Sequence, residues 1–150
     1  MKRGACAIWE GALMGGAGRL TTDSRLLADS PFSFTTRFGD APGTNPEELI
    51  AAAHAGCFSM ALAFLLGEAK RAPESIRTAA ELSFENVGTS WTVTGIHLSV
   101  VARVPGMADP EFQQLAEQAK RGCLVSRLIV VPVTLEARLA AEINDSLRPG

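Results

Sequence analysis

Cysteine is the residue type in this chain with the widest chemistry, and the sequence holds three: Cys6, Cys57 and Cys123. A thiolate can act as a nucleophile, pass through a sulfenic acid to a disulfide, or bind a metal ion. An odd, sparse count does not describe a disulfide scaffold and is typical of a reducing compartment, so we expect a cytoplasmic protein. We interpret Cys6, which lies in an expected strand without supporting charges, as structural.

The other two cysteines differ in their expected surroundings. Cys57 lies in the middle of a long predicted helix, on its apolar stripe, a position open to an inert buried thiol and to a reactive one. Cys123 directly follows Gly122, where a second helix should end, and precedes a segment that could begin another short turn. A thiol at such a helix start is accessible and has a lowered pKa.

Histidine supplies an alternative use of the same thiols. His54 and Cys57 are three residues apart on one helix face, and with Cys123 and His97 they could form a zinc site. The chain lacks the CxxC or HxxxH pairs that structural zinc sites usually carry, so we expect no metal and no other cofactor. A third interpretation is a non-catalytic dimer that binds a ligand or serves a structural role, with its cysteines in the core.

Two acidic residues and one basic residue are further candidates. Glu48 falls at the third position of the long helix, where its side chain could complete a capping box with Asn45. Glu47, one position earlier, is explained by the helix dipole alone as a solvated first-turn acid. Arg37 stands among aromatic residues, and its guanidinium could reach solvent or point inward at a thiolate.

Composition narrows the class of protein. The chain has 150 residues, enough for one domain over residues 1–150, with 47% hydrophobic and 20% charged residues, which excludes a disordered chain. A net charge of -2 argues against a nucleic-acid-binding protein, because such a surface usually needs an excess of lysine and arginine. The longest apolar run, Ile50 to Leu66, is interrupted by polar residues and glycine, so we expect no membrane span. Met1 to Ile8 lacks the apolar stretch of a secretory signal.

Periodicity and turn residues predict the elements that must position these side chains. Asn45 and Pro46 form the clearest helix start, at the N-cap and the first helical position. The remaining elements follow from alternation and from glycine and proline breaks. We predict strands over 5–13, 19–23 and 32–34, a helix from Pro46 to near Gly67 or a few residues later at Arg71-Ala72-Pro73, strands over 76–87 and 92–104, a helix opening at Asp109-Pro110 and ending at Gly122, and a strand over 129–139. This order indicates an α+β fold with antiparallel hairpins.

The run from Gly43 to Met60, GTNPEELIAAAHAGCFSM, resembles the signature of the OsmC family, whose members and relatives, the organic hydroperoxide resistance proteins, are thiol peroxidases. The segment AKRGCLVS around Cys123 resembles the region of the family's second cysteine, and Trp9-Glu10-Gly11 and Thr36-Arg37-Phe38 fit its amino-terminal pattern. His54 favours the OsmC branch, because the relatives usually have an aromatic residue there. Gly56 and Leu124 depart from the family's usual alanine and proline.

The resemblance implies a fold, a reaction and roles for four residues. It implies antiparallel sheets wrapped around a long central helix, in an intertwined homodimer. Cys57 would be the thiolate that attacks the peroxide, and Cys123 the thiol that resolves the sulfenic acid as a disulfide. Glu47 and Arg37 would hold the thiolate and the substrate, with Arg19 a rival for the arginine role. An external dithiol, for example of the lipoyl type, would recycle the disulfide.

Two further expectations follow for the site. Glu47 and Cys57 are ten residues apart on one helix, about 15 Å along its axis, which a glutamate side chain cannot span. If Glu47 serves the Cys57 site, it must come from a second copy of the chain, which supports a homodimer. An apolar pocket including Leu49, Met60 and Phe64 would suit organic hydroperoxides.

Overall fold

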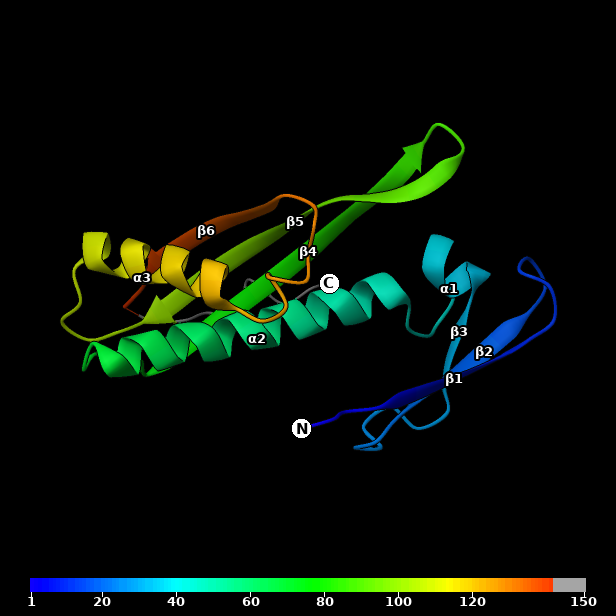
Figure 1. Cartoon of the computed structure of the whole chain (residues 1–150), viewed down its shortest axis with the longest axis horizontal. Coiled ribbons are helices and arrows are strands. Elements are labelled where there is room, and N and C mark those ends of the chain that lie inside the picture. Colours follow the sequence, from blue (N-terminus) through cyan, green and yellow to red (C-terminus); the bar gives the residue numbers. More distant parts are fainter. Residues whose placement is uncertain (142–150) are drawn as a thin grey trace. The chain divides into compact units, whose positions relative to one another are not determined.

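The computed structural model describes residues 1–141 and divides the chain into two compact units, Met1–Leu49 and Ile50–Gly150. The elements, coloured along the chain in Figure 1, are β1 Ala5–Glu10, β2 Ala17–Thr22, β3 Ser30–Ser33, α1 Phe34–Phe38, α2 Pro46–Glu68, β4 Ser75–Val87, β5 Ser90–Arg103, α3 Asp109–Gly122 and β6 Val133–Leu139. The expectation of a single domain over residues 1–150 stays a prediction, because units joined by one continuous helix can belong to one domain.

The first unit is built on an antiparallel sheet in the order β1-β2-β3, which confirms the predicted hairpin. In this sheet Trp9 lies opposite Gly18, and Gly18 lies opposite Phe32. The rings of Trp9 and Phe32 meet across the glycine with centroids 5.4 Å apart. A Cβ atom at Gly18 would stand 2.4 Å from a carbon of the Phe32 ring, so the aromatic contact requires glycine there.

Helix α1 was not predicted from the sequence, which indicated a strand through Phe34 instead. The Ser33 side chain accepts a hydrogen bond from the Thr36 N–H at 3.1 Å, and the Thr36 hydroxyl accepts one from the Ser33 N–H at 2.8 Å. This capping box turns the chain from β3 into the helix. A helix of five residues is too short for hydrophobic periodicity to reveal it.

Helix α2 begins as its capping signals predict. The Asn45 side-chain oxygen Oδ1 accepts a hydrogen bond from the Glu48 N–H at 2.8 Å, and the helix ends at Glu68, one residue beyond the expected glycine. Contrary to our expectation, α2 has the length and the apolar composition of a helix that could cross a membrane. Of its most apolar 18-residue stretch, 22% is buried. Because Phe58 and Leu62 are fully buried in the second unit, α2 is better explained as a core helix.

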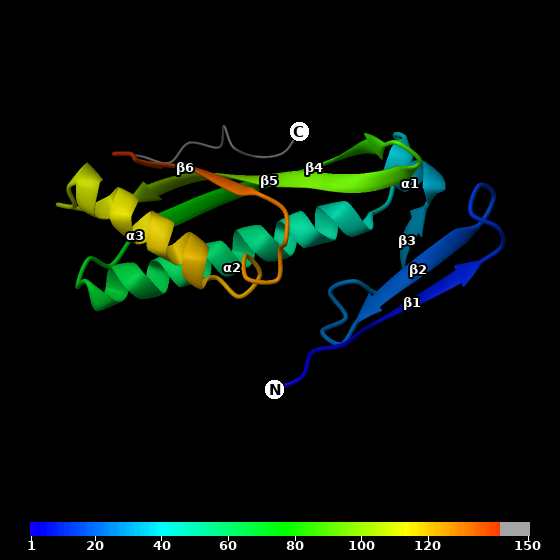
Figure 2. The ribbon, with the colours of Figure 1, turned by 45° about the horizontal axis from the view of Figure 1, so that its top comes forward.

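The second unit is a sheet in the order β4-β5-β6 with both helices on one face, as Figures 1 and 2 show. β4 and β5 form the predicted antiparallel hairpin through Gly88, whose φ of 69° favours glycine. β6 differs from the antiparallel expectation, because it pairs parallel to β5, with Ile96 opposite Val133. The reason is the connection: a chain that crosses over through a helix returns in the same direction.

The core of this unit lies between the sheet and the helices. Alternate residues of β5 point into it, as the period-two pattern predicts. It contains Phe58, Leu62 and Leu66 of α2, Ile96, Leu98, Val100 and Ala102 of β5, and Phe112, Ala116 and Ala119 of α3. These contacts hold the middle of α2 against the end of α3.

The start of α3 differs in detail from the prediction, and its end agrees with it. Ala108, not Asp109, is the N-cap residue, and no side chain caps this end. Gly122 is the last helical residue, as the sequence predicted. Cys123 therefore becomes the C-cap itself, with a φ of -59° and its N–H donating to the Ala119 carbonyl at 2.8 Å. This hydrogen bond continues the helical pattern into the cysteine.

Candidate active site

Cys57 and Cys123 form a dithiol, as the family resemblance implied. Their sulfur atoms are 2.9 Å apart although the residues are 66 positions apart in the chain. Both are free thiols. Cys57 is half-buried in α2, whereas Cys123 is only 1% exposed and belongs to the core. The expectation that Cys123 is accessible is therefore wrong, because the last turn of α3 packs inward.

The turns after α3 hold Cys123 in place. The Arg127 N–H donates to the Cys123 carbonyl at 3.1 Å, and the Ile129 N–H donates to the Ser126 carbonyl at 3.2 Å. These turns also postpone β6, which begins at Val133 instead of the predicted residue 129. The segment directs backbone N–H groups of Val125 and Ser126 at the Cys123 sulfur.

The two thiols differ in acidity. Burial raises the pKa of Cys57, and its hydrogen bond with Cys123 raises it further, against weaker opposing bonds from backbone N–H groups. Burial also acts to raise the pKa of Cys123, but hydrogen bonds from Cys57, Ser126 and Val125 outweigh it and leave that pKa below its ordinary value. The dithiol by itself therefore places negative charge on Cys123. For charge to reside on Cys57, a cation must come close to it.

Arg37 and Glu47 form an ion pair within the first unit. Arg37 Nε lies 3.0 and 3.1 Å from the two Glu47 carboxylate oxygens, and Nη2 makes a third contact with the same carboxylate. The guanidinium carbon also stands 5.1 Å from the centre of the Phe38 ring. Glu47 is buried, so it is not the solvated acid that the helix dipole alone would explain. Two-pronged bonding of this kind fixes the direction of the guanidinium.

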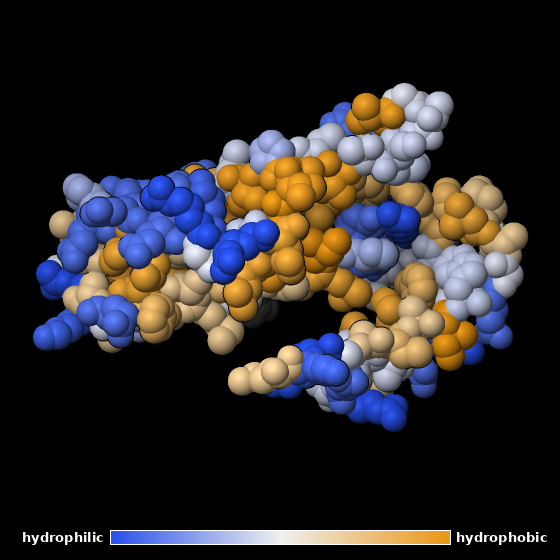
Figure 3. All heavy atoms as spheres, viewed as in Figure 1, coloured by the Kyte–Doolittle hydropathy of each residue, from blue (hydrophilic) through white to orange (hydrophobic). Residues whose placement is uncertain are grey.

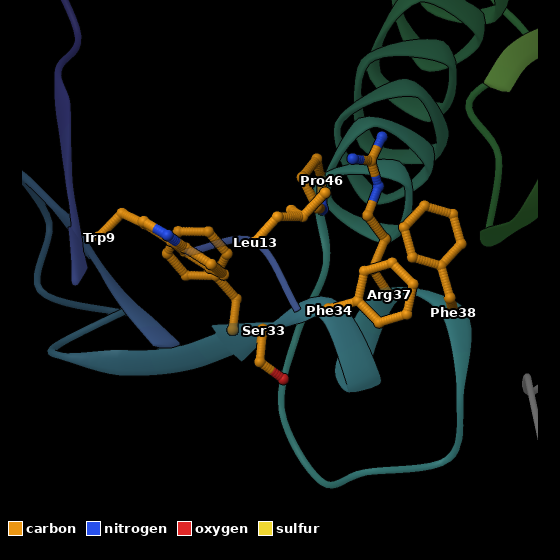
Figure 4. Close-up of a pocket in the computed structure, with 8 residues that line it drawn as sticks. Trp9, Leu13, Ser33, Phe34, Arg37, Phe38 and Pro46 are labelled. Carbon is orange, nitrogen blue, oxygen red and sulfur yellow. The ribbon is translucent and has the colours of Figure 1, made fainter. Parts of the chain in front are cut away.

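A pocket of about 310 Å³ lies beside this ion pair in the first unit. Figure 4 shows Arg37 pointing from α1 toward the first turn of α2, with aromatic side chains around it. The lining residues are Trp9, Leu13, Phe32, Ser33, Phe34, Arg37, Phe38 and Pro46. The predicted pocket of Leu49, Met60 and Phe64 is not the one found, because Met60 and Phe64 are 76% and 66% exposed on α2.

Other candidate residues lie apart from these groups. Cys6 is exposed on strand β1, and its interpretation as a structural residue stays a prediction. Arg19 makes one contact, at 3.2 Å, with Glu10 on the exposed face of the first sheet. His97 bonds Thr134 at 2.8 Å between β5 and β6. Within residues 1–141, no three histidine, cysteine or acidic side chains gather as a metal site would require.

Ser126 is a site residue that the sequence reasoning missed. Its hydroxyl lies 2.8 Å from Nε2 of the fully buried His54, and it also hydrogen-bonds the Cys123 sulfur. Its position three residues after Cys123, at a turn, was a signal that its hydroxyl could contact the Cys123 sulfur. His54 is therefore a buried, hydrogen-bonded residue of the second unit.

The α+β fold and its adjacent thiols define a dithiol protein, in which two cysteines from distant segments are positioned to form one disulfide. Comparison with known proteins then identifies the family. The model of the family described as "OsmC-like protein" matches residues 39–138. The chain belongs to the OsmC family.

Relatives confirm the branch and the fold. The chain is 44% identical over 133 residues to "Peroxiredoxin OsmC" of Escherichia coli, which covers 89% of this chain and 93% of that protein. It is 33% identical over 114 residues to an "Organic hydroperoxide resistance protein" of Xanthomonas axonopodis, covering 73% and 76%. The crystal structure of the organic hydroperoxide resistance protein OhrB of Bacillus subtilis aligns over 90% of this chain and 98% of its own, with a TM-score of 0.67 at 23% identity. The α+β fold and OsmC membership predicted from the sequence are confirmed.

Proposed function

We propose that this protein is a cysteine-based peroxidase that reduces organic hydroperoxides, and hydrogen peroxide as a smaller substrate, with Cys57 as nucleophile and Cys123 as resolving thiol. The observation that carries the proposal is the 2.9 Å separation of the two sulfur atoms in a member of this family. Cys57 receives the attacking role because it is the more exposed of the two thiols.

The reaction has two chemical steps and one recycling step. The Cys57 thiolate attacks one peroxide oxygen, the O–O bond breaks, and the alcohol leaves after taking a proton, so Cys57 becomes a sulfenic acid. The Cys123 sulfur then attacks the Cys57 sulfur, which forms the disulfide and releases water. An external dithiol reduces the disulfide and restores both thiols.

Organic hydroperoxides are favoured by the pocket beside Arg37. Its walls are mainly apolar and its polar end includes a guanidinium, a combination that suits a molecule with an apolar body and a polar peroxide head. The name of the Xanthomonas relative points to the same substrate class. Glu47 orients the guanidinium through its two carboxylate oxygens.

The complete site needs two copies of the chain. Arg37 is held by Glu47, and helix geometry separates Glu47 from Cys57 of the same α2 by about 15 Å. The raised pKa of Cys57 requires a nearby cation for the thiolate to form at neutral pH. We therefore assign that cation to Arg37 of the partner subunit, in a homodimer with two sites.

Exposed apolar surface supports this assembly. On α2, Met60 and Phe64 are 76% and 66% exposed, although the opposite side of the same helix is core. Figure 3 shows apolar atoms gathered over the segment between α3 and β6, which contains the exposed Leu124, Leu128 and Val130. Apolar surfaces of this kind are typical of protein interfaces. The first of these surfaces follows Cys57 along the chain and the second follows Cys123. A second copy of the chain that bound to them would therefore come close to Cys57.

Cysteine variants test the roles of the thiols. Cys57→Ser should abolish peroxide reduction, because a hydroxyl without an activating base is a far weaker nucleophile. Cys123→Ser should keep the first turnover and accumulate a sulfenic acid, and Cys6→Ser should change little. Intact mass after one equivalent of hydroperoxide should fall by two hydrogens in the wild type, with a 57–123 link in the peptide map. A 6–57 link, or a first turnover lost in Cys123→Ser, would contradict these roles.

Mixed dimers test the shared site. Cys57→Ser and Arg37→Ala homodimers should each have little activity. After mixing and subunit exchange, a dimer with one chain of each kind contains one intact site, so activity should recover to about a quarter of the wild-type value. A site built within one chain would show no recovery on mixing. Sedimentation of the wild type at micromolar concentration should independently report a dimer.

A further inference from the structure

His54 is a buried residue that has no role in the peroxidase steps proposed above. Its side chain is 0% exposed in the core of the second unit, and its Nδ1 atom has no hydrogen-bond partner among the described residues. Burial lowers the pKa of His54, so the imidazole is neutral near pH 7. A buried polar atom without a partner costs free energy that an aliphatic side chain would not. The residue therefore needs an explanation beyond packing.

Ser126 joins His54 to the dithiol. The serine hydroxyl lies 2.8 Å from His54 Nε2 and also hydrogen-bonds the Cys123 sulfur, which in turn lies 2.9 Å from the Cys57 sulfur. Imidazole, hydroxyl and the two sulfurs thus form one continuous chain of hydrogen bonds. A hydroxyl can accept a proton on one side while it donates its own on the other, so it can pass a proton without moving.

The attack of Cys123 on the Cys57 sulfenic acid requires a path that removes a proton from Cys123. When a cation holds the charge on Cys57, the proton of the dithiol lies on Cys123, whose sulfur then donates a hydrogen bond to the Cys57 sulfur. Cys123 must lose this proton as it attacks the sulfenic acid, because the thiolate is the nucleophile in disulfide formation. Cys123 is only 1% exposed, so bulk water is poorly placed to take that proton. The only neutral nitrogen base that the described contacts connect to its sulfur is the imidazole of His54.

We propose that His54 accepts the Cys123 proton through Ser126 while Cys123 attacks the Cys57 sulfenic acid. This inference rests on the proposed peroxidase function and adds two positioning residues to its second step. The proton passes from the Cys123 sulfur to the Ser126 oxygen, and the original hydroxyl proton passes to His54 Nε2. The S–S bond forms and the Cys57 S–O bond breaks. The departing hydroxide takes up a proton from the Ser126 hydroxyl, and His54 returns its proton to Ser126, which leaves the disulfide, one water and a neutral imidazole.

The chain offers a matched control for this role. His97 is the other histidine of the sequence, and it also bonds a hydroxyl at 2.8 Å, that of Thr134. It lies on β5 between Ile96 and Leu98, whose side chains enter the core, so alternation points His97 to the opposite face of the sheet. A histidine–hydroxyl pair on that face has no path to the dithiol.

The experiment compares His54→Gln, Ser126→Ala and His97→Gln, each with Cys6→Ser to leave only the two site thiols. Reduced protein is mixed with one equivalent of tert-butyl hydroperoxide. Alcohol release reports the first step, and acid-quenched intact mass, with a sulfenic-acid trap, reports the second. Alcohol release should stay within about twofold of the parent, whereas disulfide formation should slow at least tenfold in His54→Gln and Ser126→Ala, in line with proton-transfer effects of about 10² or more. His97→Gln should match the parent.

Each outcome decides the question. Glutamine can keep a hydrogen bond to Ser126 but cannot accept a proton, so parental disulfide formation in His54→Gln would assign His54 a purely structural role and overturn the proposal. If His54→Gln does not fold, Ser126→Ala decides alone, because it removes one oxygen at a turn. The double variant should be no slower than the slower single variant, since both break one path. Failure of the parent to release alcohol would refute the peroxidase function instead.

Discussion

Replacing Arg37 by lysine tests the ion pair that we place at the peroxide site. Arg37 approaches Glu47 side-on, with Nε 3.0 and 3.1 Å from the two carboxylate oxygens and Nη2 in contact with one of them. Lysine keeps the charge but has a single nitrogen, so it cannot reproduce this fork. The direction of the positive charge, rather than its presence, is what the substitution removes.

The magnitude follows from the burial of the pair. The Glu47 side chain is 10% exposed and that of Arg37 is 38% exposed, so the carboxylate depends on the arginine for its hydrogen bonds. A hydrogen bond to a charged group contributes about 1.5–3 kcal/mol. Loss of one such bond from the reacting arrangement corresponds to a rate about 10- to 150-fold lower. The pKa of Cys57 should rise in the same variant, because its cation is no longer held in place.

Arg19→Lys is the matched control. Arg19 makes one contact of 3.2 Å with Glu10, and the two side chains are 52% and 72% exposed. Exposed pairs contribute about 0–1 kcal/mol, so activity should change by less than about fivefold. Peroxide consumption gives the rates, and alkylation against pH, in a background where only Cys57 remains, gives the thiol pKa. A larger loss in Arg19→Lys than in Arg37→Lys would refute the assignment of the arginine.

Three further predictions concern stability and assembly. Gly56→Ala should raise the free energy of unfolding by about 0.5–1 kcal/mol in denaturant titrations, because this helical glycine has no atom within 4 Å of an added Cβ; a loss of stability would show a close neighbour there. Phe64→Glu should shift sedimentation toward the monomer without unfolding the chain, since Phe64 is exposed within one chain; an unchanged dimer would place the interface elsewhere. The lowered pKa of His54 means that the unfolded chain takes up a proton first as the pH falls below 6.5, so stability should decrease there. His54→Gln should remove that part of the decrease, and an identical pH dependence in the variant would show that another group causes it.

The sequence by itself determined the elements whose signals are local. Asn45 and Pro46 specified the start of α2, because a cap and its helix are neighbours in the chain. The turn at Gly88 and the alternation of β5 specified the second hairpin in the same way. The motif around Cys57 specified the family, which the comparisons confirm.

Only the tertiary structure decided how distant residues meet. Ser126 is 72 positions from His54, and nothing in either local pattern indicates their contact. The burial of Cys123 and the parallel direction of β6 likewise depend on how α3 crosses and packs on the sheet. Local patterns report which face of an element is apolar, whereas contacts across the core depend on where the whole chain places each element. The proton path proposed for Cys123 could therefore be recognised only after the fold had brought His54 and Ser126 together.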